Sequence, residues 1–228
     1  ERRFTADAAH ELRTPLAAVK TQAQVALMSQ DPQAREHALR QLLTGADRAG
    51  RLIEQLLRLA RLDPLSSLPD GRAVDLYDLA RETVADMLDN ALSRGHSLDI
   101  QAAGGPVVVN GDHGLLAVAL RNLIDNALRH TPTGGHVMVR VGNDNGHAEL
   151  SVLDDGPGVE ADELPHLCER FHRGRETQAE GSGLGLAIVR RIADLHGASP
   201  QFENGPQGGF IARIVWFPAS AAHKPGRL

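Results

Sequence analysis

The sequence predicts an α+β protein in which an antiparallel helical hairpin precedes an α/β sandwich. Apolar residues first recur at helical spacing, from Phe4 to about Ala60. A segment rich in Pro, Ser, Asp and Gly follows at 63–72 and indicates a domain boundary. Beyond it, strand-like alternation and helical periodicity are interspersed, which is the pattern of helices packed on one face of a mixed sheet.

The hairpin is predicted from two amphipathic segments. The first covers 4–28, and Pro15 should bend it because proline lacks a backbone N–H. The second begins after Asp31 and carries apolar residues in a three-four alternation, at Leu39, Leu42, Ala46, Ala49, Ile53, Leu56 and Ala60. More apolar residues lie beside this seam: Leu43, Leu52, Leu57 and Leu59. A single hairpin would leave these residues exposed to solvent, so we expect a homodimer with a four-helix bundle.

The remaining chain is expected to form one mixed domain. Helices are predicted over 75–93, 112–130 and 184–196, with Asp112 as an N-cap. Strands are predicted over 97–101, 107–110, 136–141, 148–153 and 209–216, with a hairpin turn at 143–146. The expected boundaries are therefore 1–63 for the hairpin, 64–73 for the linker, 74–218 for the mixed domain and 219–228 for a disordered tail.

Composition excludes several classes of function. The net charge is −5 and the basic residues are scattered, so direct nucleic-acid binding is not expected. The single cysteine, Cys168, cannot form an internal disulfide, and no Cys/His group has zinc spacing, which favours a reducing compartment. No apolar run reaches about 18 residues, so any membrane attachment would come through segments outside this sequence.

A histidine with an adjacent carboxylate stands on the first predicted helix. A surface position is the simpler interpretation of His10; a nucleophilic role requires a neutral imidazole, which histidine supplies near neutral pH, and a group such as Glu11 to orient it. A zinc protease site is ruled out, because Thr14 stands where the second metal-binding histidine would be required.

Polar residues also repeat along the helix predicted at 112–130. Asn122 and Asn126 lie four apart on one face, with Arg129 and His130 one turn further. They can form a local hydrogen-bond network. Alternatively, amide oxygens can join phosphate oxygens and water around Mg²⁺ while Arg129 neutralises phosphate charge. The residues alone leave both interpretations open.

Two glycine-rich motifs complete the set. Asp154 follows a predicted strand and precedes Gly156 and Gly158; this is either a simple turn or a carboxylate that accepts a hydrogen bond from the exocyclic amine of adenine. The second motif opens a helix, where amides favour phosphate, or is only a flexible loop; it comprises Gly181, Gly183, Leu184, Gly185 and Leu186. It lacks the ending of a P-loop, and Leu186 replaces the third glycine of a dinucleotide motif.

Taken together, these motifs resemble those of two-component sensor histidine kinases. The stretch around His10 resembles the H box, 122–130 the N box, 154–158 and 181–186 the two glycine boxes, and Glu169-Arg-Phe171 the F box. The resemblance covers nearly the whole chain and is greatest to membrane-bound proteobacterial sensors of the QseC and PmrB kind. It implies a dimerisation and phosphotransfer domain followed by a Bergerat-type (GHKL) ATP-binding domain.

The resemblance also implies roles for individual residues. His10 would be the phosphoacceptor, Glu11 would assist proton removal, and Thr14 would position water for the reverse phosphatase reaction. Asn126 would hold Mg²⁺ and Asp154 would read adenine. The other motif residues would line the nucleotide: Asn122, Arg129, His130, Gly156, Gly158, Phe171, Gly181, Gly183, Leu184, Gly185 and Leu186.

The function expected from this resemblance is autophosphorylation of His10 from Mg·ATP, with transfer to an aspartate of a response-regulator receiver domain. The chain would then be the cytoplasmic part of a bacterial inner-membrane protein. Two rival functions are a Bergerat-fold ATPase or serine kinase and an ATP-binding dimeric scaffold without chemistry. The enzyme rivals do not predict a histidine on a heptad-patterned hairpin; turnover of bound ATP would exclude the scaffold.

Overall fold

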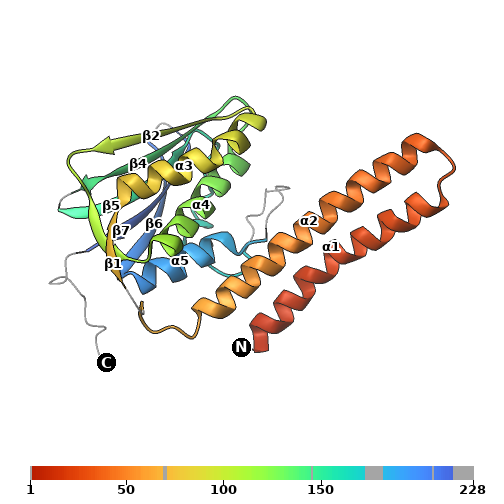
Figure 1. Ribbon diagram of the computed structural model, residues 1–228, viewed down its shortest axis with the longest axis horizontal. Helices are drawn as coiled ribbons and strands as arrows, with labels where there is room; N and C mark the ends of the chain where they lie inside the picture. The colour runs from red at the N-terminus through yellow and green to blue at the C-terminus, as the bar shows by residue number, and fades with distance from the viewer. Residues whose placement is uncertain (1, 69–70, 145, 173–181, 207, 218–228) are drawn as a thin grey trace. The chain divides into compact units, whose positions relative to one another are not determined.

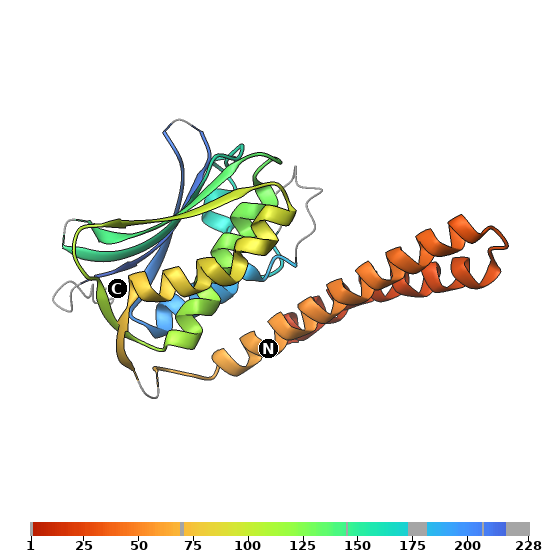
Figure 2. The same cartoon turned by 45° about the horizontal axis from the view of Figure 1, so that its top comes forward.

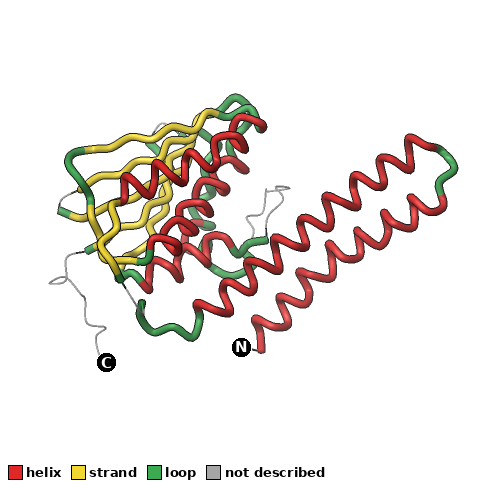
Figure 3. The backbone as a smooth tube through the Cα atoms, in the orientation of Figure 1, coloured by secondary structure: helices red, strands yellow, loops and turns green. Residues whose placement is uncertain are grey.

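The computed structural model describes residues 2–68, 71–144, 146–172, 182–206 and 208–217. The chain divides into two compact units, Glu1–Arg61 and Leu62–Leu228. Figures 1 and 3 show that the first is a pair of long helices and that the second combines helices with a twisted sheet. The α+β fold class is confirmed. Within the described residues, no helix is both long enough and apolar enough to cross a bilayer.

The hairpin consists of α1 (Arg2–Met28) and α2 (Pro32–Leu62), both close to the predicted helices. Asp31 starts α2, because its Oδ1 accepts the backbone N–H of Gln33 at 3.0 Å and satisfies one otherwise unpaired helix donor. The two helices approach closely at Gly45. A Cβ there would lie 2.9 Å from Cγ2 of Val19. Gly45 therefore permits this close helix packing despite the low helix propensity of glycine.

The apolar seam of α2 differs from the predicted one. The buried apolar residues of α2 are Ala38, Ala49, Leu52, Leu59 and Leu62. Of these, only Ala49 belongs to the predicted seam, whereas the seam residues Leu39 and Ile53 are 47% and 45% exposed. Ala46 and Ala60 are also exposed. Most of the apolar residues that α2 buries thus stand one position before a residue of the predicted seam. The reason is that α1 covers only one side of a broad apolar face. Of the four apolar residues predicted to be left exposed on a single hairpin, Leu43 and Leu57 are more than half exposed, whereas Leu52 and Leu59 are buried. Further exposed apolar residues of the hairpin are Leu16, Leu27 and Met28.

The second unit is built around a mixed sheet of five strands in the order β2-β4-β5-β7-β6. The strands are β2 (Ser97–Ala103), β4 (His136–Asp144), β5 (His147–Asp154), β6 (Ala198–Asn204) and β7 (Phe210–Trp216). β2 and β4 are parallel, and the other pairs are antiparallel. A separate two-stranded sheet pairs β1 (Arg72–Asp75) with β3 (Val108–Gly111).

Three helices cover one face of the five-stranded sheet, as Figure 2 shows. They are α3 (Leu76–Ser93), α4 (His113–His130) and α5 (Gly185–Leu195); a short 3₁₀ turn, η1, spans Leu164–His166. The segregation of helices to one face, predicted from the sequence, is confirmed. So is Asp112 as the N-cap of α4, since its Oδ1 accepts the N–H of Leu115 at 2.9 Å.

Several element boundaries were predicted wrongly. The strands β1 and β6 were missed, and the helix predicted from residue 75 begins at Leu76, with Asp75 as its N-cap. β4 and β5 extend further into the predicted turn, to Asp144 and from His147. Pairing with neighbouring strands, which a single sequence does not reveal, extends these elements. The predicted tail at 219–228 lies outside the described residues.

The core lies between the helices and the inner face of the sheet. Helix α4 runs through its centre and buries one apolar stripe completely, comprising Leu116, Leu120, Leu123, Ile124 and Leu128. Val139 and Leu150 of the sheet and Ile188 of α5 are also fully buried. Because these side chains fix the rotation of α4 about its axis, they also determine where its polar residues lie.

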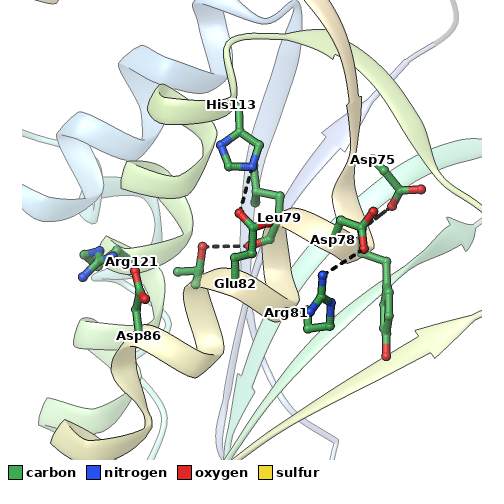
Figure 4. A network of polar contacts seen from close by, with 10 residues as sticks. Asp75, Asp78, Leu79, Arg81, Glu82, Asp86, His113 and Arg121 are labelled. Atoms are coloured by element: carbon green, nitrogen blue, oxygen red, sulfur yellow. Dashed lines mark hydrogen bonds and ion pairs between the residues drawn. The ribbon is translucent and has the colours of Figure 1, made fainter.

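Exposed polar contacts join α3 to α4 at the surface (Figure 4). Arg121 pairs with Asp86 at 2.9 Å, and His113 lies 3.4 Å from Glu82. Such exposed pairs each contribute at most about 1 kcal/mol. The apolar core, rather than this network, therefore holds the two helices together.

A buried histidine ties the end of α5 to the start of α4. The Nδ1 of His196 donates to the carbonyl of Ile192 at 2.7 Å, and its Nε2 accepts the N–H of Asp112 at 3.0 Å. The second bond requires the neutral ring, because a protonated Nε2 could not accept the N–H of Asp112. Burial lowers the pKa of His196 from its ordinary value, against smaller opposing effects of Ile192 and Asp112. The folded state therefore binds fewer protons here than the unfolded state does.

This arrangement predicts acid sensitivity. Stability should be unaffected by His196 above its unfolded pKa near 6.5 and should fall as the pH drops below it, because protonation favours the unfolded chain. The pKa of His130 is also lowered, so His130 makes stability fall with decreasing pH in the same way. Glu169 raises the pKa of His166, so the contribution of His166 to stability changes with pH in the opposite direction. We expect His196→Gln, which cannot be protonated, to reduce the difference in melting temperature between pH 7.5 and 5.5. An unchanged difference would contradict this assignment.

Candidate functional site

A half-buried carboxylate, that of Asp154, marks the end of β5. The Oδ1 of Asp154 accepts the backbone N–H groups of Gly156 at 2.9 Å and of Phe210 at 3.3 Å. Burial raises the pKa of Asp154, while these two hydrogen bonds act in the opposite direction. Among the described residues, both hydrogen bonds are to Oδ1, and Oδ2 has no hydrogen-bond partner. The residue is thus held rigidly with one oxygen available for a polar group of a ligand.

Backbone segments approach this carboxylate so closely that side chains would not fit between them. A Cβ at Gly156 would lie 2.9 Å from Oδ1 of Asp154 and 3.2 Å from the carbonyl oxygen of His130. Gly209 has φ +83°, and a Cβ there would lie 1.9 Å from the carbonyl oxygen of Asp154. The first glycine motif therefore meets the end of α4 on one side and the start of β7 on the other.

Two residues near this motif were missed by the sequence analysis. Asn204 holds the loop after Gly158: its Oδ1 accepts the N–H of Val159 at 2.8 Å, and its Nδ2 donates to the carbonyl of Val159 at 2.7 Å. A Cβ at Gly158, which has φ +78°, would lie 2.7 Å from that Oδ1. Asn204 and Gly209 stand in a Gly-rich segment, and the pair of adjacent glycines at 208–209 was the available signal.

The polar residues of α4 face the start of α5. The Nδ2 of Asn122 donates to the carbonyl of Val118 at 2.8 Å, which fixes its amide. Its Oδ1 would lie 3.2 Å from a Cβ placed at Gly185, the first residue of α5. Asn126, one turn further, is half-buried. The asparagine motif and the second glycine motif, far apart in sequence, are therefore neighbours.

The last turn of α4 carries the two remaining residues of the motif. Arg129 is exposed and His130 is half-buried. Burial lowers the pKa of His130, and the positive charge of Arg129 lowers it further. The neutral form of His130 is therefore favoured near pH 7, and Arg129 carries the positive charge at this end of α4.

Phe171 and the second glycine motif contact each other directly. The N–H of Phe171 donates to the carbonyl of Gly183 at 2.9 Å. Gly183 has φ +68°, and a Cβ there would lie 2.6 Å from the carbonyl carbon of Phe171. Phe171 itself has φ +63°, a rare conformation for a residue with a side chain. Strain of this kind persists only where the surroundings impose it.

The remaining positions of the second glycine motif differ in character. Leu184 is fully buried, so its side chain belongs to the core, and only its backbone can face a ligand. Its N–H is bonded to Oγ of Ser182 at 3.2 Å. Leu186 is half-buried, and Gly181 lies outside the described residues. The first N–H groups of α5 have no partner within the helix, which favours an anion there.

The histidine of the first motif lies on the other unit. His10 and Thr14 are exposed on α1, Glu11 is half-buried, and Pro15 is buried. Pro15 has no N–H to donate to the carbonyl of Glu11 in the usual helical pattern. An exposed imidazole beside a carboxylate, on a helix interrupted in its hydrogen bonding, is accessible to a reaction partner.

The donor set indicates which metal could bind. Within the described residues, no three His, Cys, Asp or Glu side chains gather in a way that could hold a metal ion. A protein-only cage is therefore not formed by these residues. The amides of Asn122 and Asn126 on one face of α4 fit Mg²⁺ that is shared with phosphate oxygens and water.

Comparisons with known proteins agree with this arrangement. Residues 1–65 match the family described as His Kinase A (phospho-acceptor) domain. Residues 111–221 match the family of histidine kinase-, DNA gyrase B- and HSP90-like ATPases. The predicted order of a phosphoacceptor hairpin and an ATP-binding domain is thereby confirmed.

Relatives are similar over nearly the whole chain. The sensor protein QseC of Escherichia coli (strain K12) is 46% identical over 217 residues, covering 95% of this chain and 47% of the relative. The sensor protein kinase PmrB of Pseudomonas aeruginosa is 42% identical over 231 residues, covering 100% of this chain and 48% of the relative. The chain thus spans about half the length of these curated relatives.

Solved structures share the fold. The cytoplasmic segment of histidine kinase QseC has 33% identity and a TM-score of 0.54, with 75% of this chain and 93% of that chain covered. Histidine kinase ThkA, in complex with response regulator protein TrrA, has 19% identity and a TM-score of 0.76 over 94% of this chain and 60% of that chain. From the two family matches and these relatives, the chain belongs to the two-component sensor histidine kinases.

Proposed function

We propose that this chain phosphorylates its own His10 with ATP and then passes the phosphoryl group to an aspartate of a response regulator. One observation carries the proposal: four motifs separated in sequence converge around Asp154 and the start of α5, while an exposed histidine stands on the hairpin. A simple turn at Asp154 would account for the hydrogen bond from Gly156, but not for the second hydrogen bond, which comes from the distant Phe210.

ATP would bind with its adenine at Asp154 and its phosphates toward α5. The carboxylate accepts a hydrogen bond from the exocyclic amine, and Gly156 and Gly158 keep the site open for the ring. The N–H groups at the start of α5 and the guanidinium of Arg129 compensate phosphate charge. The same space would be lined by Asn122, His130, Phe171 and Gly183. The contacts of Asn122 with Gly185, of His130 with Gly156 and of Phe171 with Gly183 support this grouping.

In the chemical step, a ring nitrogen of His10 attacks the γ-phosphorus in line with the departing ADP. The bond between phosphorus and the β,γ-bridging oxygen breaks, a P–N bond forms, and the ring proton leaves with help from Glu11. In-line displacement needs the two reacting atoms within about 3.5 Å, so the linker has to allow the ATP-binding unit to bring bound ATP to His10. Thr14, exposed one turn after His10, would position water in the phosphatase reaction.

Mg²⁺ would be held by Asn126, with Asn122 beside it, and by phosphate oxygens. When bound, the ion neutralises charge on the phosphates and orients them. The fixed amide of Asn122 and the lack of a carboxylate cluster among the described residues support this shared site rather than a site formed by protein alone.

Two partners are proposed. A second copy of the chain would cover the apolar residues exposed on the hairpin and complete a four-helix bundle. A receiver domain would dock near His10; the ThkA structure, which holds a response regulator, supports this choice of partner. Dimerisation is the expected state of a hairpin with this much exposed apolar surface.

We also propose how the chain is organised. The hairpin with its phosphoacceptor occupies 1–63, the linker 64–73 and the ATP-binding domain 74–218, with a tail at 219–228. The chain would be the cytoplasmic part of a bacterial inner-membrane protein, since it covers most of the QseC cytoplasmic segment and about half of full-length QseC.

An ATPase without a phosphoacceptor and a silent ATP-binding scaffold are the rival functions. Neither accounts for the pairing of a phosphoacceptor family match with an ATPase family match in one chain. Turnover of bound ATP would exclude the scaffold, and protein-bound phosphate would exclude the simple ATPase.

The first prediction concerns the phosphoacceptor. His10→Ala should reduce incorporation of label from γ-labelled ATP below detection, because the nucleophile is lost, while ADP affinity stays unchanged. His37→Ala is the matched control, since His37 is an exposed histidine on the other helix of the hairpin. The proposal that His10 is the phosphoacceptor would be contradicted if His10→Ala still acquired label, or if His37→Ala lost label to the same extent.

The second prediction concerns adenine. Asp154→Asn should weaken ADP binding in calorimetry by about tenfold or more, the scale of a hydrogen bond to a charged group. Asp155→Asn is the control: it changes the next residue in the same way and keeps an acceptor for the N–H of His136, which Asp155 accepts at 2.9 Å. Equal losses of ADP affinity in the two variants would contradict the proposal that Asp154 recognises adenine.

A further inference from the structure

The adjacent ends of β6 and β7 form one side of the proposed adenine site. Asn204, the last residue of β6, is the register partner of Phe210, the first residue of β7. The N–H of Phe210 donates to Oδ1 of Asp154 at 3.3 Å. Next to it, the backbone of Gly209 lies so close to the carbonyl oxygen of Asp154 that no Cβ fits between them. The start of β7 therefore contacts both the side chain and the backbone of the residue proposed to bind adenine.

Asn204 supports the other end of the first glycine box. Its Oδ1 accepts the N–H of Val159 at 2.8 Å, and its Nδ2 donates to the carbonyl of Val159 at 2.7 Å. An amide side chain offers an acceptor and a donor on two different atoms, whereas a carboxylate offers acceptors only. The approach is so close that a Cβ at Gly158 would lie 2.7 Å from Oδ1 of Asn204. Val159 is thus held at both of its backbone polar groups by one side chain.

The segment 154–159 is consequently attached at both of its ends. β5 pairs with its neighbouring strands up to Asp154, and Oδ1 of Asp155 accepts the N–H of His136 at 2.9 Å. These contacts fix the start of the segment. The remainder carries two glycines, whose backbone has more conformational freedom than that of other residues. The side chain of Asn204 fixes the far end of this otherwise flexible stretch.

The orientation of the proposed adenine acceptor depends on this stretch. Oδ1 of Asp154 accepts the N–H of Gly156 at 2.9 Å, so a displacement of the segment would change a hydrogen bond that orients the carboxylate. Loss of the Asn204 side chain would release the end of the segment and let Gly156 move. The affinity of Asp154 for the exocyclic amine of adenine should then fall, although Asn204 itself contacts the protein backbone and not the base.

We infer that Asn204 is a positioning residue that fixes the first glycine box against the ends of β6 and β7 and thereby sets how tightly Asp154 binds the exocyclic amine of adenine. This inference rests on the proposed function and adds to it a residue that none of the sequence motifs contains. Asn204 acts through Val159 and Gly156. A residue with this role affects nucleotide affinity, and therefore KM for ATP, while kcat stays nearly unchanged.

The test measures binding of ADP and of inosine diphosphate by calorimetry. Inosine diphosphate has a carbonyl oxygen in place of the exocyclic amine, so the wild type should bind ADP more tightly. Asn204→Ala should weaken ADP binding about three- to tenfold, the scale of one hydrogen bond, and should change the affinity for inosine diphosphate less than about twofold. A general loss of structure would weaken the binding of both nucleotides alike, whereas a reduced preference for ADP is specific to recognition of the amine.

Asn110 provides a matched control. It is an exposed asparagine near the end of β3 and is followed by a glycine, as Asn204 is. Asn110→Ala should leave the affinities for both nucleotides unchanged. Asn204→Asp keeps the shape and an acceptor oxygen but cannot donate to the carbonyl of Val159, so it should also weaken ADP binding selectively. This variant provides the comparison if Asn204→Ala does not fold.

A double variant tests whether Asn204 acts through Asp154. Asn204→Ala combined with Asp154→Asn should bind ADP no more weakly than Asp154→Asn alone, because the hydrogen bond that Asn204 supports is already weakened in that background. Additive losses of ADP affinity would mean that the two residues act independently, and would overturn the inference.

The outcomes separate this inference from the proposed function. If the wild type prefers ADP and Asn204→Ala keeps the full preference, the role of Asn204 is refuted and the proposed adenine site stands. If the wild type binds the two nucleotides equally, recognition of the amine by Asp154 is itself refuted. Autophosphorylation gives a further readout, in which Asn204→Ala should raise KM for ATP and keep kcat within about twofold. A lower kcat with an unchanged KM would contradict a positioning role in nucleotide binding.

Discussion

The close approach of three backbone segments at the end of β5 is the constraint on which the rest of the site depends. The carbonyl oxygen of Asp154 occupies the space of a Cβ at Gly209, and Gly156 fits between that carboxylate and the end of α4. Only glycine permits this geometry. Because the strands and α4 are fixed by a largely apolar core, the carboxylate is already held in one orientation, which would reduce the entropic cost of binding a ligand.

Helix α4 connects this constraint to the phosphate side. Its buried stripe, including Leu123 and Ala127, fixes its rotation, so Asn122 and Asn126 lie together beside that stripe. Asn122 then faces the beginning of α5 rather than solvent. The same helix therefore packs into the core with one set of positions and offers the next set to the proposed nucleotide site. A change of volume in the core would displace the amides as well as lower stability.

Much of this could be predicted from the sequence, because the governing patterns are local. Asp112 as N-cap and the apolar period of α4 were sufficient to place that helix. β6 was missed because Pro200 and its polar residues depart from strand patterns, and only pairing with β7 makes it a strand. The seam of α2 was misplaced because a wide apolar face admits more than one partner. Leu184 was predicted to line the nucleotide because it stands in a glycine motif; its side chain fills the core, so only its backbone could do so. The contacts of Asn204 with Val159 join residues distant in sequence, which no local pattern reveals.

The most direct test of the account is the chemistry of the phosphate that the protein acquires. The purified chain would be incubated with γ-labelled ATP and Mg²⁺, and the protein-bound label would then be exposed to acid and to alkali. The account predicts label that is lost in acid and kept in alkali, as a P–N bond on histidine requires. Acid-stable label would indicate a hydroxyl acceptor, and the absence of label would indicate an ATPase or a scaffold; either result would contradict phosphoryl transfer to His10.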